Sequence, residues 1–143
     1  PLWSRGLGDV YKRQLDVEFN TIQKDKKLAS YLKKSKCKLL ISWHDFKKTP
    51  NESQLKSRFN KMRKFSNVVK IVTVAKNVSD ASRLLSLYSV KSKNKMVAFC
   101  MGDQGKFSRI LCLHLGSPFT YVSLGKAIAP GQFSVDEIKS LEN

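Results

Sequence analysis

The stretch Val68–Ala75, VVKIVTVA, is an apolar run that contains one charged residue, Lys70. Its length and its β-branched residues predict a strand. Two more runs have the same character, Cys37–Trp43 before it and Met96–Met101 after it. Continuous apolar runs of this kind are buried on both faces, which is typical of a parallel sheet with helices packed on it. The sequence therefore predicts an α/β fold.

Amphipathic segments separate these strands. The segment 51–65, for example, carries Leu55, Phe59 and Met62 at helical spacing. The whole pattern predicts five strand–helix units, with strands at 15–19, 37–43, 68–75, 96–101 and 119–123 and helices at 21–35, 51–65, 79–90, 107–115 and 134–141. Doubly wound sheets and (β/α)8 TIM barrels are both built from such units. Because a closed barrel needs about 250 residues, five units would make only the last part of one, with about three units missing before Leu15.

The first fourteen residues, Pro1–Gln14, carry no clean periodicity and lead abruptly into the first strand. They resemble translated adaptor sequence, so we exclude them from the reasoning about the fold. The expected organisation is a non-native segment, 1–14, followed by one partial barrel domain, 15–143.

The chain of 143 residues is strongly basic, with 27 Lys and Arg against 11 Asp and Glu. This excess can indicate nucleic acid, an anionic membrane surface or an anionic substrate as a partner, or only a solvated lysine-rich surface, which we favour. The lysines are scattered without interleaved aromatic residues, so we expect no nucleic-acid partner and keep a basic nucleic-acid-binding module as the competing interpretation. No apolar run is long enough to cross a bilayer and no signal peptide is recognisable, which predicts a cytoplasmic protein with no membrane partner. The three cysteines, Cys37, Cys100 and Cys112, have no zinc-binding spacing, so we expect structural roles for them and no metal site.

Two residues in or directly after the apolar strands could carry out chemistry. Lys70 lies within a strand, where burial favours a neutral, nucleophilic amine. The alternative is a lysine on an edge strand whose ammonium group reaches water. His44 follows the run that ends at Trp43 and could transfer protons near neutral pH, or it could only fix a loop by hydrogen bonds.

Two loops add polar groups, and in parallel βα folds such loops meet at the carboxyl ends of the strands. Arg109 follows a turn that contains Gly102 and Gly105, and it could hold a carboxylate in a bidentate pair or be a surface arginine. Gln132 follows Pro130 and Gly131, and it could bind a polyhydroxylated ligand or serve ordinary turn and capping chemistry. Each signal is weak alone, and their order along one βα series strengthens them.

From Leu15 almost to the C-terminus, the ordered motifs resemble those of type I 3-dehydroquinate dehydratases. The matching segments are D-x-E at Asp16–Glu18, H-D-F-x-x-T-P at His44–Pro50, the lysine-bearing strand VVKIVTVA, M-G-x-x-G-x-x-S-R at Met101–Arg109, G-S-x-x-T-[FY] at Gly116–Tyr121 and A-P-G-Q at Ala129–Gln132. The resemblance implies a (β/α)8 TIM barrel, truncated here to about its last five units. It also implies a hydro-lyase of the shikimate pathway of aromatic amino acid biosynthesis, which converts 3-dehydroquinate to 3-dehydroshikimate and water. No metal or organic cofactor is implied, and the parent enzyme would be a homodimer.

The resemblance also implies roles for single residues. Lys70 would form a Schiff base with the ring ketone of the substrate, and His44 would donate and accept protons. Arg109 would bind the substrate carboxylate, and Gln132 would bind ring hydroxyls. Glu18 would be a further substrate-binding residue.

The chain departs from the family pattern in two respects. Ile128 stands where the family has a substrate-binding serine, and the early strands with their E-W-R segment are missing. An inactive fragment of the enzyme is therefore an alternative to the active dehydratase.

Overall fold

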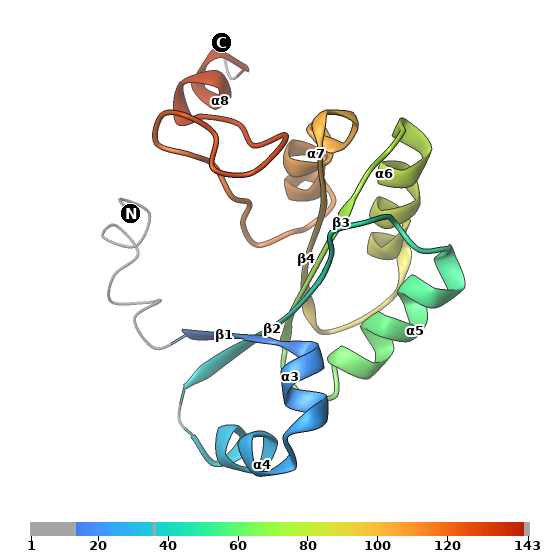
Figure 1. Cartoon of the computed structure of the whole chain (residues 1–143), viewed down its shortest axis with the longest axis vertical. Helices are drawn as coiled ribbons and strands as arrows, with labels where there is room; N and C mark the ends of the chain where they lie inside the picture. Colours follow the sequence, from blue (N-terminus) through green and yellow to red (C-terminus); the bar gives the residue numbers. More distant parts are fainter. Residues whose placement is uncertain (1–13, 36, 142–143) are drawn as a thin grey trace.

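A four-stranded parallel sheet forms the centre of the computed structural model, which describes residues 14–35 and 37–141 (Figure 1). The strand order is β1-β2-β3-β4, and the strands are β1 (Gln14–Glu18), β2 (Lys38–Asp45), β3 (Val68–Val74) and β4 (Lys95–Met101). The predicted parallel α/β fold is confirmed. Of the segment 1–14, which we expected to be non-native, only Gln14 lies within the described residues.

Helices follow each of the first three strands and connect it to the next parallel strand. They are α3 (Phe19–Lys24), α4 (Lys26–Lys34), α5 (Glu52–Met62) and α6 (Val78–Leu85), which continues as the 3-10 turn η1 (Ser86–Ser89). The predicted helix at 21–35 is wrong in one respect, because it is broken at Asp25. The side chain of Asp25 accepts a hydrogen bond from the backbone N–H of Leu28 at 2.9 Å and caps a new helix there.

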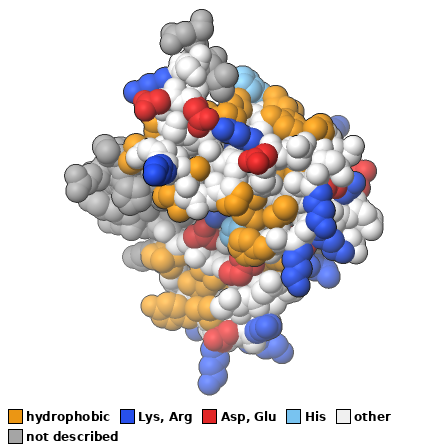
Figure 2. Space-filling view, turned by 45° about the horizontal axis from the view of Figure 1, so that its top comes forward, with side chains coloured by type: hydrophobic (Ala, Val, Ile, Leu, Met, Phe, Trp, Pro, Cys, Tyr) orange, Lys and Arg blue, Asp and Glu red, His pale blue; other side chains and the backbone are white. Residues whose placement is uncertain are grey.

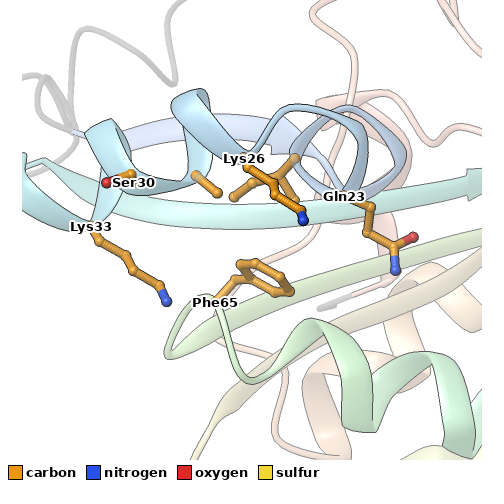
Figure 3. A pocket seen from close by; sticks show the side chains of 7 residues that line it. Gln23, Lys26, Ser30, Lys33 and Phe65 are labelled. Atoms are coloured by element: carbon orange, nitrogen blue, oxygen red, sulfur yellow. The ribbon is translucent and has the colours of Figure 1, made fainter.

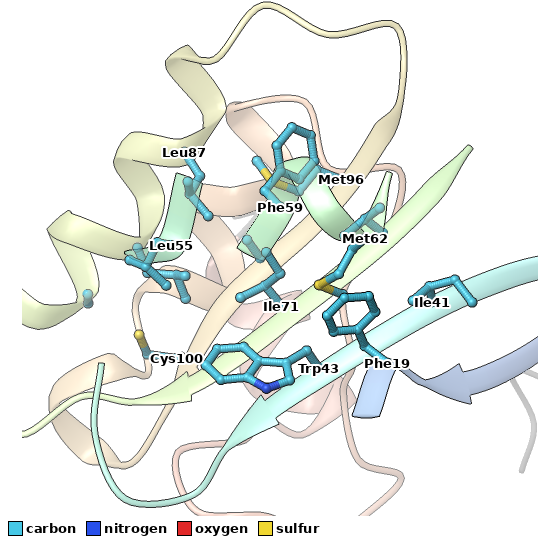
Figure 4. Close-up of a cluster of buried hydrophobic side chains, with 14 of the residues drawn as sticks. Phe19, Ile41, Trp43, Leu55, Phe59, Met62, Ile71, Leu87, Met96 and Cys100 are labelled. Carbon is cyan, nitrogen blue, oxygen red and sulfur yellow. The ribbon is translucent and has the colours of Figure 1, made fainter. Parts of the chain in front are cut away.

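The main core lies between the sheet and these helices. In Figure 1, α5 and α6 lie on one side of the sheet, and Figure 4 shows the aromatic and aliphatic side chains that fill the space between. Phe19, Leu55, Phe59 and Ile71 are almost completely buried in this core. Each such side chain contributes roughly 1.5–3 kcal/mol to folding, so this layer holds the strands in place.

The opposite face of the sheet is covered by the chain after β4. A short 3-10 turn η2 (Asp103–Gly105) leads into α7 (Ser108–His114), and the segment that follows crosses this face before α8 (Val135–Leu141). Phe119 and Tyr121 pack there against Phe99 of β4, with ring centroids 5.7 Å apart for Phe119–Tyr121 and 5.9 Å apart for Tyr121–Phe99.

The prediction that 119–123 forms a fifth strand of the sheet is therefore wrong. Only Ser123 makes an isolated parallel bridge, to Ser134. The aromatic side chains of this segment are partly buried against the sheet face, and that burial replaces pairing along the edge of β4.

Within residues 14–35 and 37–141, no helix is long and apolar enough to span a membrane.

Candidate active site

Strand parity places a row of polar side chains on the face opposite the main core. Side chains two residues apart on a strand share a face, so Asp16 and Glu18 of β1 lie on one side together. The strand register puts Glu18 beside Ser42 of β2, and Ser42 beside Lys70 of β3. His44 lies two pairs further towards the carboxyl ends of the strands, on the same face, beside Val72 of β3. Figure 2 shows a histidine between acidic side chains on the surface of the molecule, with hydrophobic side chains next to it.

Lys70 lies in β3, which pairs with β2 on one side and β4 on the other. It is therefore not a lysine on an edge strand. Its side chain is only 12% exposed, and its Nζ donates a hydrogen bond to Oδ2 of Asp16 at 3.2 Å. The same Nζ lies 4.7 Å from the centroid of the Tyr121 ring. The amine is thus held between a carboxylate and an aromatic face, a more polar setting than the apolar neighbours in its strand indicate.

His44 forms a pair with Glu18. Its Nδ1 lies 2.9 Å from Oε2 of Glu18, and its ring stacks on Phe46 at a centroid distance of 5.7 Å. Because a carboxylate only accepts hydrogen bonds, Nδ1 carries the proton, and Nε2 of the neutral ring keeps a lone pair that can take a proton. The other oxygen of this carboxylate, Oε1, is buried and has no hydrogen-bond partner among the described residues.

Arg109 belongs to the first turn of α7 and is 2% exposed. Its guanidinium carbon lies 4.4 Å from the centroid of Phe99, a residue in the same row of the sheet face as His44 and Val72. Burial lowers the pKa of Arg109. No carboxylate of the described residues forms an ion pair with the guanidinium. Its Nε is buried and has no hydrogen-bond partner among these residues. A buried, unpaired guanidinium is a group that an anionic ligand would stabilise.

Gln132 lies in a loop that packs on the end of β4. Its Oε1 accepts hydrogen bonds from the backbone N–H groups of Ile128 and Ala129 at 3.0 and 3.2 Å. The carbonyl of Pro130 in the same turn accepts a hydrogen bond from the backbone N–H of Gly102 at 3.1 Å. The loop therefore reaches the carboxyl end of β4, although no contact of Gln132 with Lys70 or His44 is found among the described residues. The side chain of Ile128 is 89% exposed and points away from the protein.

Two residues of this cluster, Asp16 and Tyr121, were absent from the set of site residues expected from the sequence. Asp16 could have been found, because its parity places it on the same face as Glu18. Tyr121 could not have been placed from its expected position in a paired strand, because the segment that carries it crosses the sheet face.

The described cavities lie elsewhere. One of about 450 Å³ lies between the first two helices and Phe65, and Gln23, Lys26, Ser30 and Lys33 line it (Figure 3). It lies on the side of the sheet that carries the main core, whereas Lys70 and His44 are on the opposite face. Within the described part of the chain, no group of three or more His, Cys, Asp or Glu side chains is placed to hold a metal ion.

Comparisons with known proteins agree on one family. The family model for type I 3-dehydroquinase matches residues 11–142. The 3-dehydroquinate dehydratase of Pyrococcus abyssi is 36% identical over 139 residues, which are 96% of this chain and 62% of that protein. The crystal structure of the 3-dehydroquinate dehydratase of Aquifex aeolicus is 32% identical and superposes with a TM-score of 0.75, covering 91% of this chain and 59% of that one.

A structure of the type I enzyme of Clostridium difficile with covalently modified comenic acid is 26% identical, with a TM-score of 0.76 and coverage of 90% of this chain and 53% of that one. The chain thus spans little more than half the length of these relatives. Its parallel strands and helices match one part of their (β/α)8 barrel. The chain belongs to the type I 3-dehydroquinase family.

Proposed function

We propose that the complete enzyme to which this chain belongs dehydrates 3-dehydroquinate to 3-dehydroshikimate through a Schiff base on Lys70. The observation that carries this proposal is the position of Lys70, which is nearly buried on a central strand of the sheet. His44 lies on the same face of the neighbouring strand, next to the residue that pairs with Lys70 on that face. A buried lysine that is held close to a proton-transfer group has the arrangement that imine chemistry needs.

The reaction begins at the amine of Lys70. After it gives up a proton, the neutral nitrogen attacks the ring ketone, and loss of water gives a protonated imine. The imine withdraws electrons and acidifies the C–H bond on the neighbouring carbon. When that proton leaves, the electron pair moves to form the ring double bond and the β-hydroxyl departs as water. Hydrolysis of the imine then restores Lys70 and releases the product.

His44 is the group that we assign to proton transfer. Its Nε2 would take the C–H proton and return it to the departing hydroxyl. Glu18 would hold the imidazole by its 2.9 Å contact with Nδ1 and would stabilise the cation that forms when Nε2 is protonated. This assignment differs from the role in substrate binding that the sequence led us to expect for Glu18.

Arg109 and Gln132 are assigned to substrate binding. The guanidinium of Arg109, which is buried without a partner carboxylate in the described residues, would pair with the carboxylate of 3-dehydroquinate. Gln132 would offer its amide N–H groups to ring hydroxyls, because its Oε1 already accepts two backbone hydrogen bonds. Ile128 has no hydroxyl, so this chain would lack the contact that a serine at this position supplies.

Reduction of the imine tests this proposal. The complete enzyme is incubated with 3-dehydroquinate and borohydride, and the modified residue is located by mass spectrometry. We expect one irreversible adduct, on Lys70, that is lost in Lys70→Met and kept in Lys76→Met, since Lys76 is an exposed lysine just beyond the end of the same strand. An adduct on another lysine, or no adduct, would contradict the mechanism.

We also propose that the complete enzyme is a cytoplasmic homodimer. The free thiols Cys100 and Cys112 are buried, and free cysteines suit the reducing compartment. Size measurement of the complete enzyme in solution tests the dimer.

A further inference from the structure

The nitrogen of Lys70 has two neighbours whose effects on charge can be compared. Oδ2 of Asp16 lies 3.2 Å from it, and the centroid of the Tyr121 ring lies 4.7 Å from it. The carboxylate is 44% exposed, so water weakens its attraction for the nitrogen. The ring packs in a cluster of aromatic side chains on the sheet face, so water weakens its attraction for the nitrogen less.

The aromatic neighbours of Tyr121 fix the direction in which its ring faces. Phe119 meets the ring edge-on, with an interplanar angle of 76°, and Phe99 lies at 55° on another side. An aromatic side chain that is held by two others keeps its geometry with little entropic cost on ligand binding. The face that Tyr121 offers to Lys70 is therefore supported by two neighbouring rings.

We propose that the ring of Tyr121 stabilises the positive charge on the Lys70 nitrogen in the protonated imine, which makes Tyr121 a positioning residue of the dehydratase. The face of an aromatic ring attracts a cation and does not attract a neutral imine in this way. The ring would thus favour the protonated form of the intermediate, and only that form withdraws electrons strongly enough to acidify the neighbouring C–H bond. The single N–H of the protonated imine would still donate to Asp16.

The hydroxyl of Tyr121 stays neutral under working conditions. Burial, with a smaller contribution from the charge of Asp16, raises the pKa of Tyr121 to about 12. A phenolate here would be a second anion beside the amine and would hold it as an ammonium, which cannot attack a ketone. A neutral phenol avoids that second full charge and leaves only the weaker attraction of the ring face, which acts on any cation at this nitrogen.

This inference rests on the proposed function, and its test keeps the two apart. In the complete enzyme, Tyr121 is replaced by Phe, by Leu and by phenylalanines that carry one, two or three fluorines. The yield of the borohydride-reduced adduct on Lys70 is measured at several pH values with subsaturating 3-dehydroquinate. Fluorine withdraws electrons from the ring and changes its shape little.

We expect Tyr121→Phe to keep the adduct yield within about twofold, and Tyr121→Leu to lower it by roughly 3- to 30-fold. The yield should fall step by step as fluorines are added. Phe119→Leu is the matched control, because it removes a ring from the same segment that is not over Lys70 and leaves Phe99 to hold the ring of Tyr121. Its yield should fall by less than that of Tyr121→Leu.

Three results would overturn the inference. One is a yield that does not respond to fluorination, and another is an equal loss in Phe119→Leu, which would mean that Tyr121 acts only through packing. The third is the absence of any adduct on Lys70 in the wild-type enzyme, which would overturn the proposed function as well. The fluorinated series also covers the case in which Tyr121→Leu fails to fold.

Discussion

Glu18 and His44 make the clearest pair of residues to test singly, because two roles for Glu18 predict different kinetics. In Glu18→Gln, the amide can still contact Nδ1 of His44 but carries no charge to stabilise the imidazolium. We expect kcat to fall roughly 10-fold, a part of the 10²- to 10⁴-fold that a general base supplies, with KM changed little. Steady-state kinetics of the complete enzyme measure both constants.

The matched control is Glu52→Gln, at an exposed glutamate that forms an ion pair with Lys56 on the same helix. It should leave both constants unchanged. A rise in KM at constant kcat in Glu18→Gln would instead mean that Glu18 binds the substrate, as the sequence led us to expect.

Arg109 is expected to stabilise the bound substrate and to destabilise the free protein. In Arg109→Met, the apolar side chain can still pack on Phe99, and the cost of burying a guanidinium without a partner carboxylate is removed. We expect the free energy of unfolding to rise by about 1 kcal/mol and KM for 3-dehydroquinate to rise roughly 10- to 100-fold. Denaturant titration without substrate gives the first quantity, and kinetics give the second. A loss of stability with unchanged KM would show that Arg109 is a structural residue.

At the scale of the elements, the loop that carries Gln132 depends on a close approach between two glycines. A Cβ added to Gly131, whose φ is +70°, would lie 2.3 Å from the carbonyl oxygen of Gly102. Gly131→Ala should therefore push the loop off the end of β4, raise KM and speed tryptic cleavage at Lys126, while the sheet stays folded.

Gly125→Ala is the matched control for this prediction. Gly125 also has a positive φ, of +125°, but a Cβ there would meet no atom within 4 Å. It would show the effect of backbone strain alone, and we expect it to affect KM and cleavage less than Gly131→Ala. Equal effects of the two substitutions would mean that the contact with Gly102 does not hold the loop.

Periodicity predicted the sheet well because the signals for its strands are local. The apolar runs of β2, β3 and β4 end within about two residues of their predicted bounds, and Asn51 caps α5 through a reciprocal capping box with Gln54. The predictions of one unbroken helix at 21–35 and of a strand at 119–123 were wrong for different reasons. A single cap outweighed the helical pattern in the first case, and in the second, aromatic side chains packed partly buried on the sheet face.

The candidate site was predictable only in part. His44 could be placed because the end of a strand is visible in the sequence, and Lys70 because a charge within an apolar run stands out. The pairing of Glu18 with His44 and of Asp16 with Lys70 depends on the order of strands and on their register. Neither can be read from one strand alone, because side-chain contacts between strands join residues 26 and 54 positions apart.

At the scale of the whole molecule, one group of four lysines and the candidate active site lie at opposite ends of the sheet. A groove of about 840 Å³ at the amino ends is lined by Lys33, Lys38, Lys93 and Lys95 among other residues. His44 and Arg109 lie towards the carboxyl ends. An anion that binds this groove would therefore leave the candidate active site open, so nucleic-acid binding and dehydratase activity can be measured separately. A steep fall of binding with salt would identify the former.

The last prediction concerns activity of the 143-residue chain by itself. Among the described strands, β1 pairs only with β2 and β4 only with β3, so each has an unpaired edge, whereas a closed barrel has none. The chain also spans only 62% of the Pyrococcus abyssi enzyme. Residues that bind the other side of the substrate would come from strands that lie outside this span. We therefore expect kcat/KM of the chain alone to be at least roughly 100-fold below that of the relative, as loss of several substrate contacts would cause.

The corresponding segment of the Pyrococcus abyssi 3-dehydroquinate dehydratase is the matched control, because it lacks the same strands. It should lose activity to a similar extent. Light scattering should detect self-association of both segments through their sheet edges. If the 143-residue chain were within tenfold of the complete relative in kcat/KM, four parallel strands and the segment that crosses them would suffice for catalysis, and the assignment of essential contacts to further strands would be wrong.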